Sequence, residues 1–319
     1  MKISVSGRAA YAYTGTRAFN PTQRTATFIH GAANDHSVWA LQSRYFAWHG
    51  WNVLAIDLPG HGQSDGPFCA SIEALADWVA AFLDAAQVKA AVVIGHSMGS
   101  LTALELSARR PDLVSKLALV GSAVPMLVGD ALLDAALSNE EKARRMIVDW
   151  SFAPNSQLGN NHKVPGTWLP GNSLALMRRM DKGVLHNDLA ACKAYVNGLI
   201  AAANVQCPAF VLMGERDMMT APKAAQGVVA ALKSVRTETI ADAGHNMMSE
   251  APNVTLRRCG CLRMIRQLQS AFLALSSSPW GGGVRGEGAS VSCKFGSHAT
   301  SLTPTLSPGE RGRDAARSR

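Results

Sequence analysis

The stretch "AAVVIGHSMGSLTALELSARR" (90–110) decides the fold class and points to a chemistry. Its first part is a short run of Val, Ile and Ala, which is typical of a buried strand, and its second part has apolar residues at helical spacing. The two meet at a Gly-X-Ser-X-Gly pattern in residues 95–99. A turn this sharp needs small neighbours, and it would hold the Ser97 hydroxyl up at the sheet edge. We therefore predict that Ser97 is a nucleophile and not part of an ordinary surface turn.

A serine at its ordinary pKa is a weak nucleophile, so it needs a base, and that base needs a carboxylate to orient it. Asp217 follows the apolar run "PAFVLMG" (208–214), and His245 follows "VRTETIA" (235–241). Both runs are predicted strands, so both residues are expected at the same sheet edge as Ser97. The order along the chain is nucleophile, acid, base, as in hydrolases that carry such a serine turn.

Two other acids compete with Asp217 for the role of the orienting carboxylate. Asp242 is too close to His245 in sequence to approach it easily from a separate strand. Glu215 precedes the turn that holds Asp217, and we expect its side chain to point away. We therefore favour Asp217.

An oxyanion hole requires two backbone N–H donors. We expect one from Met98, directly after the nucleophile, where the N-terminus of the following helix also supplies positive dipole. We expect the other from Ala32, in the loop after the predicted strand "TATFIHG" (25–31). His30 is interpreted as a structural partner of that loop and not as a base.

Short apolar runs alternate with helix-like stretches over much of the chain, which predicts a parallel sheet with helical crossovers. The alternation lapses between Ser122 and Cys207, where helical pieces flank a Gly/Pro/Asn-rich loop. We interpret this region as a helical insertion between two strands, with a lid or structural filler as its possible uses. The remaining predictions are strands at 25–31, the start of 52–65, 90–95, 115–122, 208–214 and 235–241, an edge hairpin in the first fifteen residues, and helices at 71–86, 98–110, 139–153, 173–180 and 223–233.

Five segments resemble the successive signature segments of the α/β-hydrolase fold family: "FIHGAANDHSVW", "DLPGHGQSD", "VVIGHSMGS", "LMGERDMMTAP" and "DAGHNMMSEAP". The likeness covers about residues 1–254. It implies an α/β fold with a mostly parallel eight-stranded sheet flanked by helices, a helical cap inserted after strand 6, and no cofactor. The roles that it carries over are Ser97 as nucleophile, Asp217 as acid, His245 as base, and the backbone of Ala32 and Met98 as oxyanion donors.

The expected chemistry is acyl transfer through an acyl-serine intermediate that water, activated by the histidine, then hydrolyses. Aromatic and methionine walls suit an apolar substrate, so we favour a carboxylic ester or a lactone. A C–C bond hydrolase of dienoic diketo acids would use the same triad. A non-catalytic binding module is a further alternative. The candidate substrate-binding residues, each with core packing as its other explanation, are Trp39, Met126, Trp150, Met218 and Met247.

Composition narrows the possible partners. The chain of 319 residues is 47% hydrophobic and 17% charged, which allows a large core. It has no run of about 18 uncharged apolar residues and no apolar secretory leader, so we expect a cytoplasmic protein that does not insert into a membrane. Residues 1–254 hold 21 Lys and Arg against 20 Asp and Glu, so nearly all of the formal net charge of +8 lies in the tail and no nucleic-acid partner is expected. The pair Cys259 and Cys261, even with His298, lacks zinc spacing, so we expect free thiols and no metal. Nothing indicates the oligomeric state.

The resemblance divides the chain into a hydrolase core (1–122 and 207–275), a cap (123–206) and a disordered basic tail (276–319). The sequence changes character at Thr255: the 65 residues from there hold 10 Lys and Arg against 3 acids, and the later part is rich in Gly, Ser and Pro. We hypothesise a shift of reading frame near Val254, with a natural basic extension as the alternative. Residues 261–275 have a partial apolar stripe and could form the closing helix. Loss of that helix would loosen the histidine loop and inactivate the protein.

Overall fold

The computed structural model describes residues 1–159 and 161–258, which belong to one unit spanning Met1–Leu273. Its centre is an eight-stranded sheet with the order β1-β2-β4-β3-β5-β6-β7-β8. The first two strands run antiparallel to their neighbours, and all later pairs are parallel. The predicted eight-stranded, mostly parallel sheet is therefore confirmed. The strands are β1 (Lys2–Val5), β2 (Arg8–Tyr13), β3 (Thr25–Ile29), β4 (Asn52–Ile56), β5 (Ala91–His96), β6 (Val114–Val120), β7 (Ala209–Gly214) and β8 (Val235–Ile240).

Strands β3, β4, β5 and β7 are buried along their whole length because helices cover both faces of the sheet. In β5, Val93 belongs to one core cluster, whereas its neighbours Val92 and Ile94 belong to the other. This alternation follows from the two-residue period of a strand. Helices α2 (Ile72–Ala85), α3 (Met98–Arg109), α9 (Gly198–Asn204) and α10 (Gln226–Ala231) pack with the first cluster, and α1 (Ala40–Trp48), α11 (Met247–Glu250) and α12 (Pro252–Arg258) with the second.

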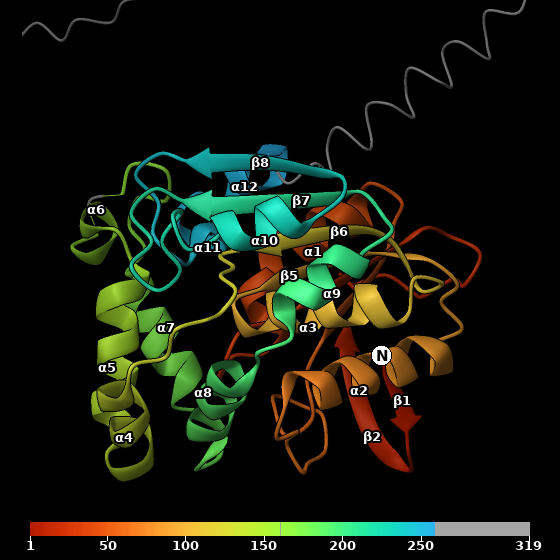
Figure 1. Cartoon of the computed structure of the whole chain (residues 1–319), viewed down its shortest axis with the longest axis horizontal. Coiled ribbons are helices and arrows are strands. Elements are labelled where there is room, and N and C mark those ends of the chain that lie inside the picture. The colour runs from red at the N-terminus through yellow and green to blue at the C-terminus, as the bar shows by residue number, and fades with distance from the viewer. Residues whose placement is uncertain (160, 259–319) are drawn as a thin grey trace, which may run out of the picture. The chain divides into compact units, whose positions relative to one another are not determined.

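The chain between β6 and β7 forms helices that continue past the edge of the sheet. In Figure 1 most of them gather on the left, the side toward which the arrowheads of β7 and β8 point. They have an apolar cluster of their own, which includes Leu132, Val148, Phe152 and Leu185. The carboxyl ends of the strands, where ligands bind in open α/β sheets, therefore face these helices. They are α4 (Asp130–Ser138), α5 (Glu140–Ser151), α6 (Pro154–Gln157), α7 (Leu169–Met177), α8 (Val184–Ala194) and the already named α9.

The predicted helix N-cap at Ser71 is present in the structure, whereas several helical segments had no signal in the sequence. Ser71 caps α2, and its side chain accepts a hydrogen bond from the Ala74 amide. Helix α1, the short 3-10 helix His36–Trp39 and helix α8 were not predicted, because their apolar residues follow no clear helical period.

Helix α12 runs across the point at which the sequence changes character. It begins at Pro252 and continues to Arg258, and Leu256 is buried in the second core cluster. The hydroxyl of Thr255 donates to the carbonyl of Met247 (2.8 Å). Core packing therefore extends past Val254, while the predictions for Cys259 and Cys261, for residues 261–275 and for the basic tail lie outside the described residues. In the described part of the chain, no helix is long and apolar enough to cross a membrane.

Candidate active site

Ser97 occupies a strained turn between β5 and α3. Its backbone has φ 53° and ψ −122°, a conformation that side-chain-bearing residues rarely adopt. Two glycines make the turn possible. A β-carbon at Gly95 would overlap the carbonyl oxygen of Gly99, and one at Gly99 would overlap the carbonyl oxygens of Ile29 and His30. The pattern therefore reflects a close approach of β3, β5 and α3, which fixes the serine at the end of the strand.

His245 and Asp217 meet from the loops after β8 and β7. The distance from His245 Nδ1 to Asp217 Oδ2 is 2.8 Å, and both side chains are buried. Asp217 also accepts from the amides of Met219 and Thr220, each at 2.8 Å, and from the Thr220 hydroxyl at 2.7 Å. Burial works against the charge of Asp217, but His245 and Thr220 outweigh it and lower the pKa of the carboxyl to about 2. Asp217 is therefore an ionised acceptor that orients the imidazole.

The rival acids lie elsewhere. Asp242 and Glu215 are exposed, and the Asp242 amide donates to the Glu215 carboxylate at 3.0 Å. Ser97 and His245 instead line one cavity. Since Nδ1 of His245 faces Asp217, its Nε2 is the nitrogen left to serve a hydroxyl in that cavity.

Two backbone amides are available beside the serine. Among the described residues, neither the Ala32 N–H nor the Met98 N–H has a hydrogen-bond partner. Met98 is the first residue of α3, so its amide also carries the positive end of the helix dipole. The next amide along the β3 loop, Ala33 N–H, is occupied, because it donates to Asp188 Oδ2 (2.9 Å).

Two other histidines support the site as neutral rings. His30 Nε2 accepts from the Leu58 amide (3.1 Å), and its Nδ1 lies 2.8 Å from the Gly31 carbonyl. Burial lowers the pKa of His30 to about 4, and burial with the neighbouring His245 lowers that of His96 to about 3. His96 Nε2 in turn lies 3.1 Å from the His245 carbonyl. Each neutral ring holds its loop through these hydrogen bonds and does not act as a second base at the serine.

One group in the described part of the chain has the composition of a metal site. Ligand atoms of Asp35, His36 and Asp57 lie within 4.8 Å of one another. Three of their polar atoms are used in hydrogen bonds: Asp57 Oδ1 accepts from the His36 amide (2.7 Å) and from the His36 ring Nδ1 (2.8 Å), and Asp35 Oδ1 accepts from the Ser37 amide. Burial opposes the charge of Asp57, but His36 outweighs it and lowers the pKa of that carboxyl. The group therefore ties the loops after β3 and β4 together.

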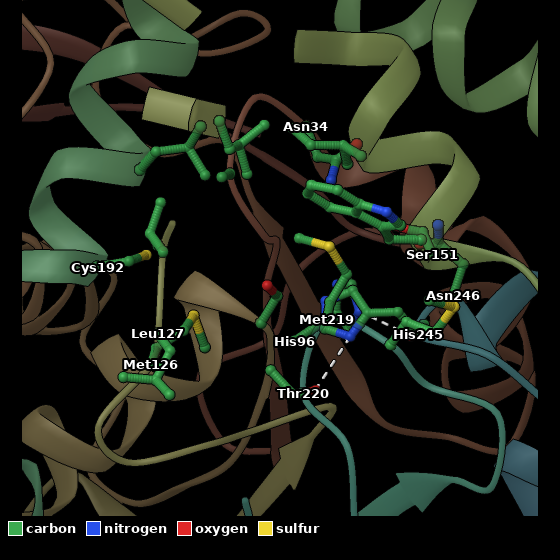
Figure 2. A pocket seen from close by; sticks show the side chains of 18 of the residues that line it. Asn34, His96, Met126, Leu127, Ser151, Cys192, Met219, Thr220, His245 and Asn246 are labelled. Atoms are coloured by element: carbon green, nitrogen blue, oxygen red, sulfur yellow. Dashed lines mark hydrogen bonds between the residues drawn. The ribbon is translucent and has the colours of Figure 1, made fainter. Parts of the chain in front are cut away.

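The cavity at Ser97 measures about 270 Å³. Three of the five candidate wall residues, Met126, Trp150 and Met218, line it. Trp39 and Met247 do not: both are fully buried in the second core cluster, where Trp39 packs against Phe28 with ring centroids 5.3 Å apart. The sequence-based assignment of these two residues is therefore corrected to core packing. In Figure 2, Met126, Leu127 and Cys192 lie on one side of the cavity, and Ser151, His245 and Asn246 on the other.

Several residues of the site were not found from the sequence. The Thr220 hydroxyl donates to Asp217 and lies 3.2 Å from His245 Nδ1. A dashed line from Thr220 in Figure 2 marks the contact with His245. The Ser151 carbonyl, at the end of α5, accepts from the His245 amide at 2.7 Å. The bond from the Met219 amide to Asp217 could have been found, because an aspartate side chain in a turn commonly accepts from the backbone two residues on, whereas no such local signal predicts the Thr220 hydroxyl. No sequence signal predicts the contact from Ser151, since it joins distant segments.

Comparison with known proteins agrees with this fold. The sequence profile of the alpha/beta hydrolase fold matches residues 27–252. The chain belongs to the α/β-hydrolase fold family. Several of its relatives are named as hydrolases, and together with the family match this makes the chain an enzyme of the hydrolase class.

Two relatives and one solved structure show how the named reactions differ among proteins similar to this chain. A pimeloyl-[acyl-carrier protein] methyl ester esterase of Neisseria meningitidis is 33% identical over 226 residues, which cover 68% of this chain and 84% of the relative. An (E)-2-((N-methylformamido)methylene)succinate hydrolase of Acinetobacter baylyi is 26% identical over 196 residues, which cover 59% of this chain and 71% of the relative. The enol-lactonase of Burkholderia xenovorans LB400 superposes with a TM-score of 0.72 at 22% identity, covering 81% of this chain and 97% of the lactonase, a likeness of fold.

Proposed function

We propose that this α/β-hydrolase cleaves a carboxylic ester or a lactone through an acyl-Ser97 intermediate. The observation that carries the proposal is the contact of 2.8 Å between His245 Nδ1 and Asp217, made at the cavity into which the strained Ser97 turn opens. This contact fixes the tautomer with the proton on Nδ1, because an ionised carboxylate can only accept. Nε2 is then free to take the serine proton.

In the proposed reaction, Ser97 Oγ attacks the substrate carbonyl carbon while His245 Nε2 takes the hydroxyl proton. The carbonyl oxygen becomes an oxyanion, for which the unoccupied amides of Ala32 and Met98 are the donors. The tetrahedral intermediate collapses, the bond to the leaving oxygen breaks, and that oxygen receives the proton from His245. Water then attacks the acyl-serine with His245 again as base, and the acid is released.

The cavity favours an uncharged substrate. Among the described residues that line it, none is Lys, Arg, Asp or Glu, and most are apolar. Its volume of about 270 Å³ lies near the lower end of ligand pockets, which span roughly 300–1,000 Å³. A dienoic diketo acid carries negative charge, and burying that charge without a cationic partner is costly. The cavity therefore supports an ester or lactone over the C–C bond substrate.

We further propose that residues 123–206 serve as a cap over the triad. Helices α4, α5, α7 and α8 each contribute at least one residue to the cavity that contains Ser97. The contributed residues include Leu132, Ile147, Trp150, Met177, Leu189 and Cys192.

A panel of substrates tests the proposed function. The purified full chain is assayed with p-nitrophenyl acetate, butyrate and octanoate, with γ- and δ-lactones, and with a dienoic diketo acid. We expect a pre-steady-state burst of p-nitrophenol equal to the enzyme concentration, which reports an acyl-enzyme, and turnover of at least one ester or lactone class. Cleavage of the diketo acid alone would support the C–C alternative. No turnover by folded protein would support a binding role.

A further inference from the structure

A buried carboxylate on α8 lies outside the proposed mechanism but contacts the loop that supplies one oxyanion donor. Asp188 is 2% exposed and does not line the cavity, although Leu189 and Cys192 on the same helix do. Its Oδ2 accepts from the Ala33 amide at 2.9 Å and lies 2.9 Å from His61 Nε2. Asp188 therefore joins three segments: the inserted helix α8, the loop after β3 and the loop after β4.

The carboxylate is held by a buried histidine. The side chains of His61 and Asp188 are 1% and 2% exposed, and His61 Nδ1 lies 3.0 Å from the Pro59 carbonyl. Burial lowers the pKa of His61, but the charge and hydrogen bond of Asp188 outweigh it, so the pKa is raised. Asn187 Nδ2 donates to the Cys69 carbonyl (2.8 Å) and to Asp188 Oδ1 (3.3 Å). These bonds leave the carboxylate little freedom to move, so it is a rigid acceptor.

The residue that Asp188 holds is strained. Ala33 has φ 49°, a left-handed conformation that a β-carbon disfavours. Such a conformation persists only where its surroundings over-determine it. The amide of Asn34 donates to the Gly31 carbonyl (3.3 Å), which closes the turn around Ala32 and Ala33. Ala33 also packs in the apolar cluster of the inserted helices, and its amide bond to Asp188 fixes the direction of the turn's backbone.

We propose that Asp188 is a positioning residue for the oxyanion hole: from α8 it fixes the strained turn at Ala33, so that the neighbouring Ala32 N–H stays directed at the reacting carbonyl oxygen. This inference rests on the proposed acyl-transfer function. It also gives the inserted helices a part in catalysis beyond forming cavity walls. Loss of the Ala33–Asp188 bond lets the turn relax, and the Ala32 donor moves away from the oxyanion position while Ser97, His245 and Asp217 keep their contacts.

Losing the Ala33–Asp188 bond should weaken stabilisation of the transition state and leave substrate binding nearly unchanged. An oxyanion donor acts where negative charge develops, so its misplacement lowers kcat with little change in KM. Removal of one such donor costs about 100- to 1,000-fold in kcat. Because Asp188 only positions the donor, we expect a smaller effect, about 10- to 100-fold for Asp188→Ala.

The test compares Asp188→Ala and the isosteric Asp188→Asn with Tyr195→Phe. Tyr195 donates to Glu105 on α3 (2.6 Å), so its variant removes a different buried bond between the inserted segment and the core. For each protein we measure the thermal midpoint, kcat and KM for an ester, and kcat/KM for the matching thionoester, whose sulfur is a poor hydrogen-bond acceptor. We expect Asp188→Ala to lower kcat, to leave KM within about threefold, and to reduce the preference for the ester over the thionoester. Asp188→Asn should recover part of the loss, because its amide oxygen can still accept from Ala33.

The outcomes separate the two proposals. If the wild-type protein forms no acyl-enzyme, the proposed function fails, and with it the basis of this inference. If the wild type is active but folded Asp188→Ala keeps the wild-type kcat and ester preference, the positioning role is overturned. If Tyr195→Phe shows the same fall in ester preference, the effect belongs to the attachment of the insertion in general and not to Asp188. Should Asp188→Ala not fold, Asp188→Leu takes its place and is judged by the same two outcomes, since it has a similar shape and no acceptor for the Ala33 amide.

Discussion

Gly121, directly after β6, lies against His245, the proposed base, and its replacement by alanine displaces that ring in a defined way. A β-carbon at Gly121 would lie 3.0 Å from both Cε1 and Nδ1 of His245, whereas ordinary β-carbon contacts are 3.4–4 Å. The ring must therefore move by about 0.4 Å or more. It cannot swing freely, because Nδ1 is held by Asp217 (2.8 Å) and lies 3.2 Å from the Thr220 hydroxyl. Since a misplacement of about 1 Å can cost about 100-fold in rate, we expect Gly121→Ala to lower kcat about 5- to 30-fold.

The same substitution also strains the backbone, and a matched control separates the two effects. Gly121 has φ 57°, so alanine there costs roughly 1–2 kcal/mol of stability. Gly50 has φ 77° and nothing within 4 Å of its would-be β-carbon, so Gly50→Ala imposes a similar strain far from the site. The assay is steady-state ester hydrolysis, with urea unfolding of both variants. Comparable losses of stability with a fall in kcat only in Gly121→Ala are expected. Equal kcat in the two variants would refute the account of a ring held from both sides.

Three further changes test other parts of the site. Thr220→Val removes the hydroxyl that donates to Asp217 (2.7 Å), and because hydrogen bonds to charged groups contribute about 1.5–3 kcal/mol, kcat should fall about tenfold or more in the ester assay. Asp217→Asn should lower kcat about 10⁴-fold through the wrong imidazole tautomer. The pKa of Asp217 is lowered to about 2, so its ionised carboxylate adds about 2 kcal/mol to the free energy of unfolding. This contribution is complete above the unfolded-state pKa near 3.9 and is lost as the pH falls toward 2. In urea unfolding, the difference in stability between wild type and Asp217→Asn should therefore shrink as the pH is lowered through that range. Trp150→Ala enlarges the cavity, so kcat/KM for p-nitrophenyl octanoate should rise relative to acetate, and an unchanged ratio would remove Trp150 from the acyl pocket.

The sheet and the placement of the triad candidates could be predicted because their signals are local. The apolar run before residue 95 and the glycines on either side of Ser97 specify a strand, a sharp turn and a helix by spacing alone. Asp217 and His245 could be placed for the same reason: each follows a short apolar run, and parallel strands bring their carboxyl ends to one edge.

The walls of the cavity could not be predicted in the same way. Trp39 and Met247 are residue types that often line pockets. Their burial in the second core cluster depends on the three-dimensional path of the loops that carry them, which the sequence does not show. Asp188 lies 155 residues from Ala33 in the chain, and nothing near it in sequence indicates a catalytic loop. Contacts of this kind arise from tertiary packing, which overrides local pattern.

The central claim is that Ser97 is an activated nucleophile in an assembled site, and site-mapped labelling by a fluorophosphonate tests it most directly. The folded full chain and a Ser97→Ala variant are treated with the probe. Their intact masses are measured by mass spectrometry, and the proteins are then digested to locate the adduct. The account predicts one adduct per chain, located on Ser97 and absent from Ser97→Ala. No adduct on folded wild-type protein, or an adduct that persists in Ser97→Ala, would contradict it.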